Sequence, residues 1–107
     1  MRYTIQHAIE IAKELEPVMA NIDMHVAIGG SLAYRGTSEK DIDIYLYPDT
    51  RQTVIDRNQI VALLATRGFK SRKANDESRT KVADVFVSEQ VTTGNKVDFF
   101  FLERHSL

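Results

Sequence analysis

Two aspartates and a preceding glycine pair have the residue types and the spacing expected of a metal-binding or catalytic site. Asp41 and Asp43 lie two positions apart in DIDIYLYP, and nine residues separate Asp41 from Gly29-Gly30-Ser31. Side chains two positions apart on a strand point to the same face. Carboxylates held side by side oppose each other's ionisation, and a divalent cation between them relieves this repulsion. Mg²⁺ suits such a pair, because it commonly binds one or two carboxylates together with waters and substrate phosphates.

A third carboxylate lies in the apolar segment KVDFFF, residues 96–101. If this segment forms a strand beside the one that carries Asp41 and Asp43, Asp98 faces the same metal ions. Three carboxylates and two metal ions about 4 Å apart are typical of phosphoryl or nucleotidyl transfer. In such a site one ion activates the attacking oxygen, and the other neutralises the leaving pyrophosphate.

The segment Gly29-Gly30-Ser31 is typical of a phosphate-binding turn. Glycines at the end of a strand allow a ligand to approach the backbone closely, and the N–H groups of a helix that begins there attract anions. The hydroxyl of Ser31 can bond a phosphate oxygen or cap the helix. No lysine follows the glycines at the spacing of a Walker A loop, so this segment is a different kind of phosphate site.

The elements that position these groups follow from hydrophobic periodicity and turn residues. Helices are predicted at residues 5–16, where Pro17 should end or kink the helix, at residues 31–35 as a short turn, and at residues 54–67. Strands are predicted at residues 24–28, 41–47, 81–88 and 96–102, the last two as an antiparallel hairpin. This order indicates an α/β or α+β domain, with a small mixed sheet flanked by helices.

Composition excludes several classes of protein. The 107 residues fit a single domain, and 43% apolar with 27% charged residues is a normal globular balance. The absence of cysteine excludes disulfide scaffolds, thiolate metal sites and cysteine nucleophiles. The N-terminal segment carries charges among its apolar positions, unlike a signal peptide, and no apolar run approaches the roughly 20 residues of a membrane span. We therefore expect a cytoplasmic protein without a membrane partner.

The net charge of −1 selects no partner, but residues 67–81 are locally basic. This segment holds six basic side chains against two acidic ones. It is either a solvated loop or a groove that contacts the phosphates of a triphosphate or RNA. It lacks the interleaved aromatic residues of a single-strand stacking platform.

The succession of IGGS, nine residues, DIDIYLY and later VDFFF resembles the nucleotidyltransferase superfamily of the DNA polymerase β type. The resemblance covers residues 22–102 and implies that Gly30 and Ser31, next to Gly29, bind the nucleotide phosphates. It also implies that the two aspartates of DIDIYLY ligate metal ions.

The third acid of the family helps to activate the acceptor hydroxyl. Asp98 and Asp84 both lie in predicted strands that could supply it. Asp98 is preferred, because the third acid of the family tends to precede an uninterrupted apolar run.

The chain is shorter than most of the family and most resembles the minimal nucleotidyltransferases, which often work beside a separate helical partner. The resemblance implies an enzyme that uses Mg²⁺, with two ions expected and Mn²⁺ as a substitute. Its donor would be an NTP, with ATP expected, and its acceptor a protein, an RNA or a small molecule. The alternative is an antitoxin or regulatory subunit, catalytic or not, that binds a HEPN-like helical partner; a homodimer is also open.

Overall fold

The computed structural model describes residues 2–50, 55–72 and 84–102. The helices in this part of the chain are α1 (Ile5–Ala20), α2 (Gly30–Arg35) and α3 (Arg57–Thr66). The main sheet contains β2 (Met24–Gly29), β4 (Ile42–Pro48), β5 (Phe69–Ser71), β6 (Asp84–Gln90) and β7 (Lys96–Phe101). A separate two-stranded pair joins β1 (Tyr3–Thr4) to β3 (Thr37–Ser38).

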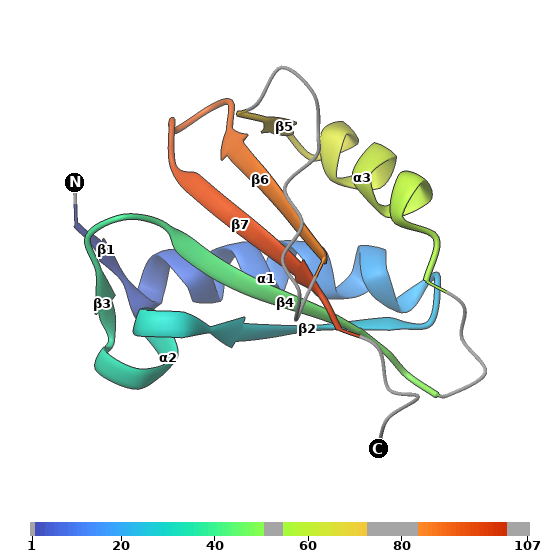
Figure 1. Ribbon diagram of the computed structural model, residues 1–107, viewed down its shortest axis with the longest axis horizontal. Coiled ribbons are helices and arrows are strands. Elements are labelled where there is room, and N and C mark those ends of the chain that lie inside the picture. Colours follow the sequence, from blue (N-terminus) through green and yellow to red (C-terminus); the bar gives the residue numbers. More distant parts are fainter. Residues whose placement is uncertain (1, 51–54, 73–83, 103–107) are drawn as a thin grey trace.

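The main sheet is mixed, as the sequence predicts. Its strand order is β2-β4-β7-β6-β5, with β4 and β7 parallel and the other neighbours antiparallel (Figure 1). The predicted hairpin is confirmed in β6 and β7. The β6 strand extends beyond its predicted end to Gln90, whereas predicted residues 81–83 lie outside the described part.

One face of the sheet carries the hydrophobic core. Ile42, Ile44 and Leu46 alternate along β4 and are fully buried. They belong to one cluster with four residues of α1 and two of α3, namely Ala8, Ile11, Leu15, Met19, Ile60 and Leu64. Burying each isoleucine, leucine or methionine side chain of this cluster contributes about 1.5–3 kcal/mol. The two longer helices therefore cover this face of the sheet. The residues of β4 that alternate with the buried ones, such as Asp43 and Tyr45, point to the other face, which we call the open face.

Of the two predicted effects of Pro17, an end or a kink, the end near Glu16 is wrong, because helix α1 continues through Pro17 to Ala20. The last turn keeps its helical form because its side chains are anchored. Met19 is fully buried, and the carboxylate of Glu16 accepts hydrogen bonds from the backbone N–H of Val26, at 2.9 Å, and from the ring of His25, at 3.0 Å. These contacts hold the end of the helix in place, although a proline removes one backbone hydrogen bond and crowds the preceding turn.

Helix α3 begins later than predicted. Asp56 caps it by accepting a hydrogen bond from the backbone N–H of Gln59 at 3.2 Å, so helical residues start at Arg57. The predicted first residue, 54, lies outside the described part. Gly68 stops the helix as predicted, with a φ of +88°. In the described residues, no helix is long and apolar enough to cross a membrane.

Candidate active site

Strand register brings three carboxylates together on the open face. The parallel pairing of β4 and β7 sets Asp43 directly opposite Asp98. Asp41 lies two residues before Asp43, immediately ahead of β4, and so points to the same face. One carboxylate oxygen from each of the three lies within 4.8 Å of the other two, and all three residues are partly buried. The structure thus gathers the aspartates that the sequence singles out into one cluster, the carboxylate cluster.

Asp84 lies elsewhere. It pairs with Phe101 in the β6–β7 register, and Phe101 is a core residue, so Asp84 belongs to the helix-covered face. Its Oδ1 accepts a hydrogen bond from Nε of Arg57, at the start of α3, at 2.8 Å. Asp84 is therefore part of an ion pair between β6 and α3, and Asp98 is the acid that joins Asp41 and Asp43.

The glycine pair lets the backbone pass close over the strand that carries the aspartates. Gly30 has a φ of +61°, and a Cβ built on it would lie 2.0 Å from Oδ2 of Asp43. A Cβ on Gly29 would lie 2.4 Å from the ring of Tyr45. A side chain at either position would force Asp43 or Tyr45 to move, so the two glycines allow these side chains their observed positions. The N-cap of α2 is Gly29, and the exposed Ser31 lies inside the helix, so its reading as the capping residue is wrong.

Two carboxylates of the cluster, those of Asp43 and Asp98, are harder to ionise than free carboxylates, because they are partly buried and close to Asp41. The pKa of Asp43 is raised to about 6, mainly by burial and secondly by the negative charge of Asp41. Burial and then the charge of Asp41 raise the pKa of Asp98 to about 7, against the opposing effect of the Arg72 guanidinium. Carboxylate oxygens at this spacing, whose ionisation is disfavoured in the metal-free protein, suit a hard divalent cation.

Arg72 contacts the carboxylate cluster, although the sequence patterns do not single it out as a site residue. The sequence places it in the basic segment 67–81, read as a solvated loop or a phosphate groove. The structure instead has Arg72 directly after β5, with Nη2 donating a hydrogen bond to Oδ1 of Asp98. Much of the remaining segment, residues 73–81, lies outside the described part.

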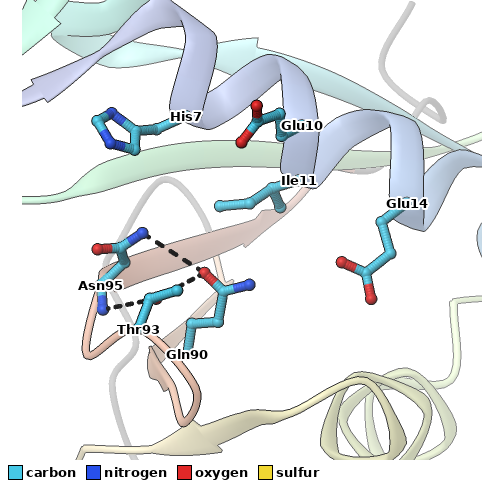
Figure 2. A pocket seen from close by; sticks show the side chains of 7 residues that line it. All are labelled: His7, Glu10, Ile11, Glu14, Gln90, Thr93 and Asn95. Atoms are coloured by element: carbon cyan, nitrogen blue, oxygen red, sulfur yellow. Dashed lines mark hydrogen bonds between the residues drawn. The ribbon is translucent and has the colours of Figure 1, made fainter.

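A pocket of about 230 Å³ lies away from this cluster, between α1 and the β6–β7 turn (Figure 2). Its turn-side lining is held by the turn's own hydrogen bonds. Oε1 of Gln90 accepts from the hydroxyl of Thr93 at 2.9 Å and from the side-chain amide of Asn95 at 3.5 Å. None of the predicted site residues lines this pocket.

The raised carboxylate pKa values predict a pH dependence of stability. Both lie above the ordinary value of 3.8, so the folded protein holds more protons than the unfolded chain between about pH 4 and pH 7. The free energy of unfolding of the metal-free protein should therefore fall as pH rises through this window. Because Mg²⁺ binds the ionised form, it should raise Tm far more at about pH 8 than at about pH 5, as measured by circular dichroism with EDTA or Mg²⁺.

His25 requires a control in that experiment. Its pKa is raised first by its hydrogen bond with Glu16 and then by that with Asp49. A raised histidine pKa gives stability that is present at low pH and lost as pH rises through the folded-state value, which has the same sign. His25→Gln should remove part of the pH dependence and leave the Mg²⁺ effect. An Mg²⁺ effect that persists in Asp43→Asn would contradict the assignment to the carboxylate cluster.

No protein-family profile matches the sequence, and no curated protein matches it. Solved structures do match. A cytoplasmic RNA terminal U-transferase superposes with a TM-score of 0.64 at 16% identity, over 92% of this chain and 29% of its own. The Cid1 poly(U) polymerase gives 0.62 at 16%, over 91% and 30%. Polymerase beta of Leishmania infantum, in a ternary gap complex, gives 0.66 at 15%, over 99% and 40%.

These likenesses define the fold. The chain has the mixed α/β fold of a polymerase β-type nucleotidyltransferase core, and the match extends over most of its length. It spans less than half of each of the three matched chains. The fold that the sequence resemblance implies is thereby confirmed.

Proposed function

We propose that this protein is a nucleotidyltransferase that uses Mg²⁺ to move an NMP from an NTP, with ATP as the expected donor, to an acceptor hydroxyl. The observation that carries the proposal is the meeting of Asp41, Asp43 and Asp98 within 4.8 Å on the open face of this fold. The Cid1 poly(U) polymerase, which shares the fold, has been solved with 3′-dATP and Mg bound and with the UTP analogue UMPNPP.

The three carboxylates share one role in this proposal, and Asp98 has a second. Asp41, Asp43 and Asp98 would hold the metal, which when bound neutralises charge on the triphosphate and on the leaving pyrophosphate. Asp98 accepts the proton of the acceptor hydroxyl as a general base. The acceptor oxygen then forms a bond to the α-phosphorus, and the bond from that phosphorus to the bridging oxygen of pyrophosphate breaks. Asp98 is suited to this role because its carboxylate lies in the same cluster as those of Asp41 and Asp43, where the metal would bind.

The glycine turn is proposed to bind the phosphates. The Gly30 backbone packs directly against the Asp43 carboxylate, because a Cβ built on Gly30 would lie only 2.0 Å from Oδ2 of Asp43. Phosphates held by the N–H groups of Gly29 and Gly30 and by the hydroxyl of Ser31 would therefore lie next to the carboxylate cluster. This adjacency supports a single site for metal and nucleotide.

We further infer that the chain acts as a minimal nucleotidyltransferase. Its acceptor would be a protein, an RNA or a small molecule, presented by a helical partner protein or by a second copy of the chain. The support is that the described residues build the nucleotidyltransferase core, and that this core holds the carboxylate cluster.

The position of the radioactive label tests the reaction class. The protein is incubated with Mg²⁺ and a fractionated host extract, using ATP labelled on either the α- or the γ-phosphate. Nucleotidyl transfer should place the α-label in one fraction, which identifies the acceptor class, while the γ-label leaves in pyrophosphate. Transfer of the γ-label to the acceptor would contradict the proposal, because that outcome defines a kinase.

A further inference from the structure

The guanidinium of Arg72 lies in the same cross-strand row as two members of the carboxylate cluster. The backbone N–H of Arg72 donates to the carbonyl oxygen of Val87 at 3.0 Å. Val87 lies opposite Asp98 in the β6–β7 pairing, and Asp98 lies opposite Asp43 in the β7–β4 pairing. Residues opposite each other on neighbouring strands share a face. Arg72 therefore reaches the cluster along the open face, from the strand at the edge of the sheet.

The contact with Asp98 is a largely buried ion pair. Nη2 of Arg72 donates to Oδ1 of Asp98, and the two side chains are only 21% and 14% exposed. A planar guanidinium fixes the plane and direction of a carboxylate better than a lysine ammonium does. Because the carboxylate of Asp98 is planar, the hydrogen bond to its Oδ1 also fixes the direction of its Oδ2. Among the described residues, neither Asp41 nor Asp43 forms an ion pair, so this support is particular to Asp98.

Stability alone does not account for the pair. Among the described residues, Nε of Arg72 is buried and has no hydrogen-bond partner. An unsatisfied buried donor costs about 1–3 kcal/mol, and buried ion pairs are often no more stable than apolar residues of the same volume. An arginine buried at this cost, with its charge against one member of the carboxylate cluster, indicates a role in the site.

We propose that Arg72 is a positioning residue of the metal site, which holds the Asp98 carboxylate in the orientation in which it joins Asp41 and Asp43. Hydrogen-bond partners of metal ligands typically contribute about 10–100-fold to metal affinity or activity. The effect of Arg72 on transfer rests on the proposed function, whereas its effect on metal binding is measured on the protein and the metal alone.

Mn²⁺ titration of the metal-free protein, with free Mn²⁺ followed by electron paramagnetic resonance, tests the proposal. Arg72→Met should weaken Mn²⁺ binding at least about tenfold. Arg72→Lys keeps the charge without the planar fork, so it should recover only part of the affinity. The matched control is Arg57→Met, which removes an Arg–Asp pair of similar burial on the opposite face. It should lower Tm but leave Mn²⁺ affinity within about twofold.

The opposite outcomes are distinct. Unchanged or tighter Mn²⁺ binding by folded Arg72→Met would overturn the proposal, and tighter binding would mean that the guanidinium only competes with the cation for Asp98. If Arg72→Met does not fold, Arg72→Lys decides, and wild-type affinity in that variant would overturn positioning. Failure of the wild-type protein to transfer nucleotide would count against the proposed function, while the Mn²⁺ comparison would still decide the role of Arg72.

Discussion

Replacing Asp43 with asparagine should abolish nucleotidyl transfer and at the same time make the metal-free protein more stable. Loss of an outer-shell partner of a metal site typically lowers activity about 10–100-fold, so loss of a ligand should lower it at least about 100-fold. Stability moves the other way, because the pKa of Asp43 is raised to about 6 by burial and by Asp41. An uncharged amide of the same size removes that repulsion. Both effects are measurable at about pH 8, as rate of transfer and as Tm with EDTA.

Asp84→Asn is the matched control for this variant. Asp84 is also a partly buried strand aspartate, but it pairs with Arg57 on the helix-covered face. Its replacement should lower Tm, because the guanidinium loses a charged partner, and should leave transfer close to the wild-type rate. Transfer by Asp43→Asn at the wild-type rate, or loss of transfer in folded Asp84→Asn, would contradict the assignment of the site.

The second large effect is expected at Gly30. In Gly30→Ala, the new methyl would lie 2.0 Å from Oδ2 of Asp43, so the carboxylate must move. A misplacement of about 1 Å in a catalytic site can lower the rate about 100-fold, and we expect a loss of that order. The positive φ of +61° adds about 1–2 kcal/mol of backbone strain. Steady-state transfer rates and denaturant unfolding measure the two effects.

Gly36→Ala separates the clash from the strain. Gly36 has a φ of +78°, yet a Cβ built there meets no atom of the described residues within 4 Å. Its replacement should lower the free energy of unfolding by about 1–2 kcal/mol, as the backbone term alone does, and leave transfer nearly unchanged. Equal losses of activity in the two variants would show that general destabilisation, and not the position of Asp43, limits the rate.

The carboxylate cluster was predictable because its determinants are local or simply periodic. The two-residue spacing of Asp41 and Asp43 fixes their common face, and the alternating isoleucines show which face is buried. Placing Asp98 near Asp41 and Asp43 depended on the assumption that its strand lies beside β4, and the parallel register confirms that the two strands are neighbours. The competing Asp84 could be set aside only with the register known, because one position along β6 reverses the face.

Other features depend on contacts between distant parts of the chain. Strand β5 has three residues, too few for a periodic pattern, and it is defined by its pairing with β6. The contact of Arg72 with Asp98 spans 26 residues of sequence and depends on that strand. The continuation of α1 past Pro17 likewise depends on its packing and on the Glu16 contacts with β2. Local propensity does not contain this information.

The most direct measurement of the central claim is transfer from α-labelled ATP into host extract, with wild-type protein and with the double variant Asp41→Asn/Asp43→Asn side by side. Circular dichroism must show that both proteins are folded. The account predicts label in one acceptor fraction, dependent on added Mg²⁺, with the wild-type protein only. Equal labelling by the folded double variant would show that the carboxylate cluster is not the site of the reaction.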